Sequence, residues 1–242
     1  MKTSRIARPS SPQRWLVAST VIAALSLSAC GATDDKTAAK TAPGAATAPT
    51  ATGNWNFEAG DLSGWDTREI GSGAWRVYSD GATPPDPTDS DPNFPFNVPD
   101  PPEGKFAAVT DMSGAGTRIL QRDVQLDGRF DLRFTLFYVN PTRLPRQSAT
   151  PPSRDFHLGE STQQFRVDLI DPAARLNSVS AKDVLTTLFA TAPGDAPKLA
   201  PRVMTFDLSR WAGRKVRIRF AQVDNSGPLR AGVDDVRLNR RK

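Results

Sequence analysis

The chain has few residues suited to covalent or metal chemistry. It contains one cysteine, Cys30, and one histidine, His157. The histidine is surrounded by residue types found in hydrolases, namely Ser153, Asp155, Glu160 and Ser161. A catalytic triad is defined by geometry, and this group has no recognisable spacing, so we expect His157 to be an ordinary loop histidine. A zinc cluster needs several Cys or His ligands, and the composition argues against one.

Cys30 instead ends a segment typical of protein export. Lys2, Arg5, Arg8 and Arg14 form a basic start, and an apolar run follows from Trp15 to Leu27. That run is shorter than the ~20 residues of a membrane-spanning helix, so we expect residues 1–29 to be a cleaved signal peptide.

The tetrad Leu27-Ser28-Ala29-Cys30 resembles the lipobox of bacterial lipoproteins. The resemblance implies that Cys30 becomes the mature N-terminus, carries acyl chains such as palmitate, and anchors the protein to a membrane of the cell envelope. Gly31 follows where an Asp would indicate retention in the inner membrane, which favours the outer membrane in a Gram-negative source. The alternatives are an unmodified thiol after an ordinary secretory signal and a buried cysteine in a cytosolic protein.

The charge of the exported part excludes one class of partner. Without the four basic residues of positions 1–29, the chain holds 27 basic and 26 acidic residues. This balance gives no net attraction for phosphate backbones, so we expect no nucleic-acid partner. We interpret Arg240-Arg241-Lys242 as a solvated terminus, with contact to anionic lipid or cell-wall polymer as the alternative. With its cysteine acylated, the mature chain would have no disulfide.

The chain after Cys30 divides into a linker and a domain. Residues 30–53 are rich in Ala, Thr and Pro and have no apolar period, which is typical of a tether. Residues 54–242 are enough for one domain with a sizeable core.

Hydrophobic residues alternate with polar ones in this domain, a period of two that predicts strands rather than helices. In residues 129–138, for example, Phe130, Leu132 and Phe134 alternate with Asp131 and Arg133. The pattern predicts strands at 54–58, 65–69, 75–78, 106–110, 118–126, 129–138, 165–169, 184–190, 203–208, 215–220 and 232–238. The expected fold is therefore all-β, an antiparallel β-sandwich.

Two long connections interrupt the strands, at residues 81–104 and 140–162. Loops of this length are uncommon in compact domains, so they are candidates for contact with a partner, with loops of no specific role as the alternative.

The two ends of the domain resemble the galactose-binding-like jelly rolls, which include carbohydrate-binding modules and MAM-like domains. The resemblance rests on the segment Asn54-Trp55-Asn56-Phe57-Glu58-Ala59-Gly60-Asp61-Leu62-Ser63-Gly64-Trp65 and on Ala231-Gly232-Val233-Asp234-Asp235-Val236-Arg237-Leu238. Between them, Phe206-Asp207-Leu208-Ser209, Trp211-Ala212-Gly213 and the strand at 215–220 also fit. The resemblance implies a jelly-roll topology, but such a framework carries unrelated functions. The paired cysteines of MAM domains are missing here.

In the carbohydrate-binding members of this group, a glutamate near the start and an aspartate near the end commonly bind a structural calcium ion. Glu58 and Asp234 match these positions, and Asp61 and Asp235 are weaker candidates. Hard oxygen ligands from the first and last strands suit Ca²⁺. The alternative is that Glu58 and Asp234 cap backbone amides.

A sugar site needs exposed aromatic faces. Trp55, Trp65, Trp75 and Trp211, with Tyr78 and Tyr138, lie on strand faces or beside turns, where rings usually belong to the core. Phe94 and Phe96 in the proline-rich loop are better placed for contact.

We therefore expect a lipid-anchored, non-catalytic binding module of the cell envelope, for a polysaccharide or another surface component. The alternatives are an envelope hydrolase with an unrecognised site and a purely structural envelope lipoprotein.

Overall fold

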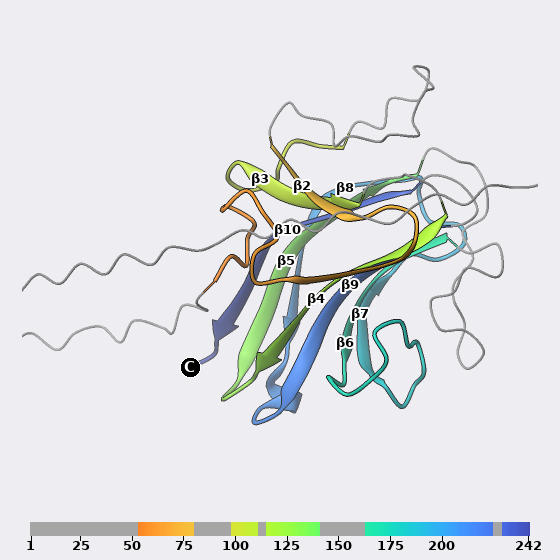
Figure 1. The fold of residues 1–242 in the computed structure, drawn as a ribbon. Helices are drawn as coiled ribbons and strands as arrows, with labels where there is room; N and C mark the ends of the chain where they lie inside the picture. The colour runs from red at the N-terminus through yellow and green to blue at the C-terminus, as the bar shows by residue number, and fades with distance from the viewer. Residues whose placement is uncertain (1–52, 80–97, 111–114, 141–162, 225–228) are drawn as a thin grey trace, which may run out of the picture. The chain divides into compact units, whose positions relative to one another are not determined.

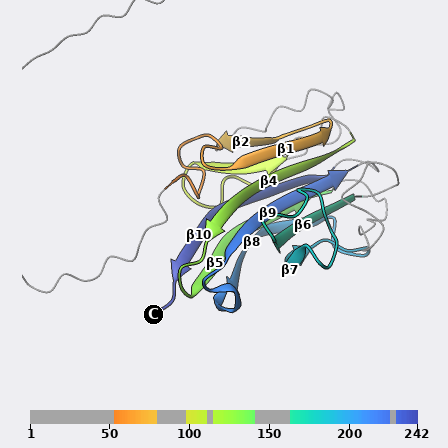
Figure 2. The same cartoon turned by 60° about the horizontal axis from the view of Figure 1, so that its bottom comes forward.

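Two five-stranded antiparallel sheets pack face to face, as both views of the ribbon show (Figure 1, Figure 2). The structure is a computed structural model, and it describes residues 53–79, 98–110, 115–140, 163–224 and 229–242. All of these belong to one compact unit, Ala46–Lys242. The prediction of an all-β antiparallel sandwich of the jelly-roll type is confirmed.

The first sheet, sheet A, has the order β1-β4-β9-β6-β7. Its strands are β1 (Asp66–Gly71), β4 (Gly116–Gln125), β9 (Lys215–Asp224), β6 (Gln163–Ile170) and β7 (Val184–Ala190). Sheet B has the order β2-β3-β10-β5-β8. Its strands are β2 (Trp75–Ser79), β3 (Phe106–Thr110), β10 (Arg230–Arg240), β5 (Phe130–Val139) and β8 (Lys198–Asp207).

The hydrophobic core lies between the two sheets, where the period-two pattern predicts it. Leu120, Phe220 and Val167 are register partners on neighbouring strands of sheet A and are fully buried. Phe134 of β5 meets Phe220 edge to face across the sandwich, with ring centroids 5.3 Å apart. Because neighbouring residues of a strand point to opposite faces, the residues between these core positions form the outer faces.

The predicted strand at 54–58 is wrong, because these residues form bends and a turn. Phe57 has a φ of 65°, in the left-handed region that an extended strand excludes. This conformation directs the chain into a turn closed by the Gly60 N–H to the Phe57 carbonyl at 2.8 Å, while the Phe57 ring is completely buried. The tertiary burial of one ring thus overrides the local alternation.

A thirteen-residue segment, 171–183, connects β6 to β7 and covers part of the outer face of sheet A. It is closed at its base by the Asp171 N–H to the Asp183 carbonyl at 2.9 Å. Leu176 and Val179 of this segment pack on Ile119, Ala221 and Val223 of sheet A. The polar side of sheet A is therefore partly an interior surface.

Several sequence predictions fall outside the described residues. These are the signal peptide, Cys30 and the linker to residue 52, as well as Phe94, Phe96, His157 and most of both long connections. No helix in the described part of the chain is long and apolar enough to cross a membrane.

Candidate functional site

Glu58 lies against the turn that leads into β3. Its carboxylate accepts the backbone N–H of Lys105 at 3.0 Å and that of Phe106 at 3.2 Å. Gly104 makes this approach possible, since a Cβ at that position would lie 2.3 Å from the Glu58 carboxyl carbon. The positive φ of Phe57 turns the chain immediately before this carboxylate.

Asp234 reaches the same turn from the centre of sheet B. Its Oδ2 accepts the backbone N–H of Glu103 at 2.8 Å, and its Oδ1 accepts the N–H of Asp235 at 2.6 Å. The residue is fully buried, at a point where the pairing of β10 with β5 shifts register. The structure therefore brings Glu58 and Asp234 to one four-residue turn, 103–106, and both cap its backbone amides.

The electrostatics of this turn are unbalanced. The pKa of Asp234 is raised to about 7. Burial is the largest cause and the negative charges of Glu103 and Glu58 add to it, while the hydrogen bond from the Glu103 N–H and the charge of Arg237 oppose it. Arg237 pairs with one oxygen of Glu103 at 2.9 Å, while Glu103 Oε2 is buried with no hydrogen-bond partner. A cation would offset the negative charge around Asp234, and it would give the unpartnered Glu103 Oε2 a metal ion to coordinate.

Glu58, Glu103 and Asp234 carry oxygen donors of the type that Ca²⁺ prefers. Within the described residues, no three His, Cys, Asp or Glu side chains lie close enough to hold a metal by themselves. Backbone carbonyls or water would have to complete the coordination shell.

The two weaker candidates do not join this cluster. Asp61 Oδ1 accepts the Ser63 N–H at 2.9 Å and the Asn54 side-chain amide at 3.2 Å, and these bonds lower its pKa. Asp235 pairs with Arg133 and Arg237. Both carboxylates are engaged in local structure.

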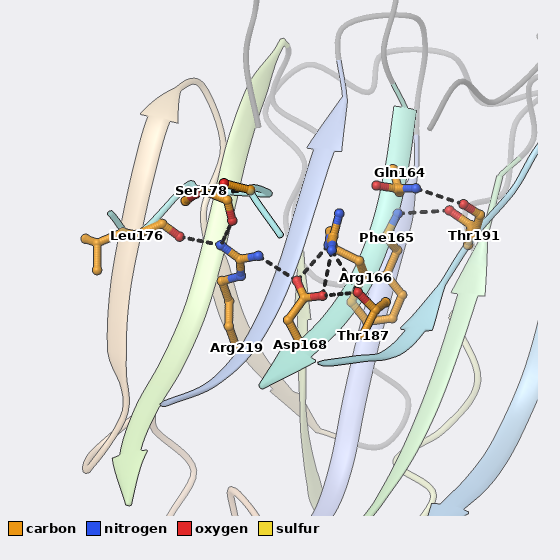
Figure 3. A network of polar contacts seen from close by, with 10 residues as sticks. Gln164, Phe165, Arg166, Asp168, Leu176, Ser178, Thr187, Thr191 and Arg219 are labelled. Carbon is orange, nitrogen blue, oxygen red and sulfur yellow. Dashed lines mark hydrogen bonds and ion pairs between the residues drawn. The ribbon is translucent and has the colours of Figure 1, made fainter. Parts of the chain in front are cut away.

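A second cluster lies on the outer face of sheet A, which the sequence pattern describes only as a polar strand face. Asp168 of β6 accepts the Arg219 guanidinium at 2.6 Å and the Arg166 guanidinium in two bonds of 2.6 and 2.7 Å (Figure 3). The Thr187 hydroxyl lies 2.9 Å from Asp168 and 3.0 Å from Arg166. Asp168 and Arg219 have no exposed side-chain surface.

Arg219 also holds the covering segment 171–183. Its Nη1 donates to the Leu176 and Ser178 carbonyls, both at 2.8 Å (Figure 3). Burial raises the pKa of Asp168, but the two guanidinium groups lower it more, so the net shift is downward. The carboxylate therefore stays ionised at neutral pH.

These residues belong to a row that crosses all five strands of sheet A. The register pairs Asp66 with Gln121, Gln121 with Arg219, Arg219 with Asp168, and Asp168 with Thr187. We call this set the transverse polar row. Asp66 and Thr187 at its two ends are exposed, and Gln121 Oε1 is buried without a hydrogen-bond partner.

The aromatic residues of the described chain serve the core. All four described tryptophans and both tyrosines are more than nine-tenths buried: Trp55, Trp65, Trp75, Trp211, Tyr78 and Tyr138. The prediction that these rings belong to the core is confirmed. A sugar platform would have to come from outside the described residues or be replaced by polar contacts.

Sequence reasoning missed Glu103 and the transverse polar row. Glu103 follows a run of prolines and has no motif of its own. Arg166, Asp168 and Arg219 do stand out as charges on alternating positions, but alternation normally indicates solvent exposure. The same outer face of sheet A also carries the apolar residues Ile119, Ala221 and Val223. Their presence indicates that another segment covers this face.

Comparisons with known proteins find structural likeness only. No family model and no curated protein matches the chain. A family 61 carbohydrate-binding module in complex with β-1,4-galactotriose is similar, with 14% identity and a TM-score of 0.43 over 79% of this chain and 99% of that one. The K1 cleaved adhesin domain of Lys-gingipain from Porphyromonas gingivalis has 15% identity and a TM-score of 0.43 over 77% and 96%. A family 4 carbohydrate-binding module has 15% identity and a TM-score of 0.31 over 69% and 94%. Carbohydrate-binding modules are thus among the structural neighbours, and these values assign neither a family nor a ligand to this chain.

Proposed function

We propose that the chain is a non-catalytic binding module of the bacterial cell envelope, held by lipid on Cys30, and that it binds a polysaccharide. The observation that carries the binding proposal is the transverse polar row. It places donors and acceptors over the width of a sheet, and three of its members, Arg219, Asp168 and Thr187, fix one another's positions. A ligand rich in hydroxyl groups needs such an arrangement.

The row is suited to binding because little of it has to be ordered when a ligand arrives. Asp168 is held by Arg166 and Arg219, and Thr187 is held by Asp168 and Arg166. Preorganised groups lose less conformational entropy on binding. An exposed polar group, Asp123 with its partners Lys215 and Arg217, lies two residues farther along the same face.

The separation of these groups favours an extended ligand. Asp123 on β4 and Thr187 on β7 are three strand spacings apart, and each spacing is ~4.8 Å. A monosaccharide cannot span that distance, so the arrangement suits a chain of sugars lying across the strands.

The proposed calcium site has a structural role in this function. Glu58 and Asp234 would hold the ion together with backbone carbonyls or water, and its charge would join the start of the domain to the central strand of sheet B. The support is the raised pKa of Asp234 and the unpartnered Glu103 oxygen. Capping of the amides of turn 103–106 is the alternative role of the same carboxylates.

The binding proposal is tested with residues 30–242 carrying Cys30→Ser, titrated with neutral β-linked galacto- and xylo-oligosaccharides and screened against insoluble polysaccharides. We expect Thr187→Val to weaken binding several-fold and Thr187→Ser to restore it. Thr205→Val is the matched control, because Thr205 is exposed on β8 of the other sheet. Folded protein that binds none of the glycans, or equal losses for Thr187→Val and Thr205→Val, would reject the proposal.

A further inference from the structure

Three segments that are far apart in the sequence meet at one end of the sandwich. They are residues 125–130, 207–215 and 240–242. Leu126 donates its N–H to the Arg214 carbonyl at 2.9 Å, and the Gly213 N–H is 2.6 Å from the Leu126 carbonyl. The Arg241 N–H is 2.9 Å from the Arg129 carbonyl. Backbone hydrogen bonds therefore fix these segments relative to one another, and we call them the basic end.

Most of the charged side chains of the basic end are cationic. Seven are basic: Arg129, Arg210, Arg214, Lys215, Arg240, Arg241 and Lys242. Within the described residues, acids at or beside this end pair with some of them. Asp127 pairs with Arg240, Asp207 and Asp131 pair with Arg241, and Asp123 pairs with Lys215.

Four exposed cations have no carboxylate partner among the described residues: Arg129, Arg210, Arg214 and Lys242. Arg210 lies beside the Trp211 ring, at 5.8 Å, and the other three are free to turn toward an external charge. In the sequence, only residues 240–242 form a basic cluster. The fold brings the cations of segments 125–130 and 207–215 next to it.

The excess of positive charge belongs to this end and not to the whole domain. Together with the neighbouring Asp123, Asp131 and Arg217, the basic end has eight basic side chains against four acidic ones. The rest of residues 54–242 holds 17 basic and 20 acidic residues. The domain therefore has one positively charged end on a body with a small negative excess.

The described chain begins on the same side, at Gly53. Gly53, the first described residue, lies beside the Arg122 guanidinium. Arg122 is three residues before the end of β4 at Gln125, whose side chain donates to the Gly213 carbonyl at 3.2 Å. Both ribbon views place the orange start of the described chain on the side where β10 ends (Figure 1, Figure 2).

We propose that the basic end is a membrane-facing surface that contacts anionic phospholipid headgroups. This proposal rests on the anchoring of Cys30, which would place the start of the tether in the membrane. An acyl anchor raises the local concentration of headgroups, so weak electrostatic contacts suffice to orient the domain. The transverse polar row lies on the face of sheet A, where its end residues Asp66 and Thr187 are exposed. Asp123 and Arg217 lie between the row and the basic end, and Asp123 pairs with Lys215 of that end.

The test uses residues 30–242 carrying Cys30→Ser, so that no acyl chain contributes. Sedimentation measures binding to phosphatidylcholine vesicles and to vesicles that also contain phosphatidylglycerol. We expect binding only to the anionic vesicles, and its loss as salt rises from 0.05 to 0.5 M, since screening shortens the range of the field. The triple variant Arg129→Gln, Arg210→Gln, Arg214→Gln should weaken binding by about fivefold per charge.

The matched control removes three exposed cations elsewhere, Arg68→Gln, Lys198→Gln and Arg202→Gln. It should retain most of the vesicle binding. Equal losses for both triple variants, or equal binding to neutral and anionic vesicles, would overturn the proposal. Binding of an acidic polysaccharide without vesicle binding would also overturn it and would assign the basic end to a wall polymer. Glycan binding at the transverse polar row is measured separately on the same variants and should not change.

Discussion

Arg219 and Asp168 are register partners on β9 and β6, and their side chains meet at 2.6 Å with no surface exposed to solvent. The pair lies on the outer face of its sheet, where an ion pair normally remains in water. Segment 171–183 excludes that water, and two of its carbonyl oxygens accept hydrogen bonds from Arg219 instead. The pair therefore has to be judged as a buried charge network and not as a surface salt bridge.

Asp168→Ala should destabilise the domain by roughly 3–5 kcal/mol, because it leaves Arg219 and Arg166 buried without their counter-charge. Urea unfolding followed by tryptophan fluorescence measures the change. Asp123→Ala is the matched control, since Asp123 also pairs with arginine on β9 but is partly exposed. We expect Asp123→Ala to lower the free energy of unfolding by at most ~1 kcal/mol. Similar losses for the two variants would contradict the burial argument.

Asp168 should also contribute to acid denaturation. Its pKa is lowered in the folded state, so its stabilising contribution is complete above about pH 4 and is lost as the pH falls through the folded value. Asp168→Asn should remove this part of the pH dependence while leaving the other carboxylates to titrate. The check is the free energy of unfolding between pH 3 and pH 7. An unchanged slope below pH 4 would show that Asp168 does not take part.

Arg122 should anchor the start of the domain through its stacking on tryptophan. Its guanidinium lies 4.3 Å from the centroid of Trp55 and 5.9 Å from that of Trp65. Arg122→Met keeps most of the volume and should cost about 1–2 kcal/mol. Arg210→Met is the control, because Arg210 is exposed beside Trp211, and we expect less than ~1 kcal/mol. A red shift of tryptophan emission should accompany only the Arg122 change.

Calcium should stabilise the domain if Glu58 and Asp234 hold the ion. A ligand that binds only the native state adds about 2.7 kcal/mol at a hundredfold excess over Kd. Thermal unfolding of metal-free protein, with calcium and with chelator, should therefore give separate curves, and Asp234→Ala should make them coincide. Coincident curves for the unaltered chain would leave the two carboxylates as amide caps alone.

Lipid attachment at Cys30 is tested by metabolic labelling with a fatty-acid analogue. Cys30→Ser should abolish the label and release the protein from the membrane fraction, because the anchor depends on the thiol. Equal membrane retention of both forms would contradict the lipoprotein prediction.

The sequence predicts most strands because each strand has one face toward the core and one outer face. Apolar and polar residues alternate along the strand accordingly. The strands at 106–110 and 184–190 agree with β3 and β7 to the residue. The prediction failed at residues 54–58, where the burial of Phe57 requires a positive φ that no pattern of residue types reveals. Glu58 and Asp234 both accept backbone amides of turn 103–106, and the role of Glu103 in that turn becomes visible only in the structure. The buried state of Asp168 depends on a covering segment, and strand periodicity contains no information about it.

The order of the strands has a consequence for biosynthesis. β9 and β10, which together span residues 215–240, are the central strands of the two sheets. A chain that emerges N-terminus first can pair β2 with β3 or β1 with β4, but it cannot join either sheet into one piece until these last strands are available. The native sandwich therefore cannot be completed before residues 215–240 have been synthesised, and the earlier strands lack their central partners until then.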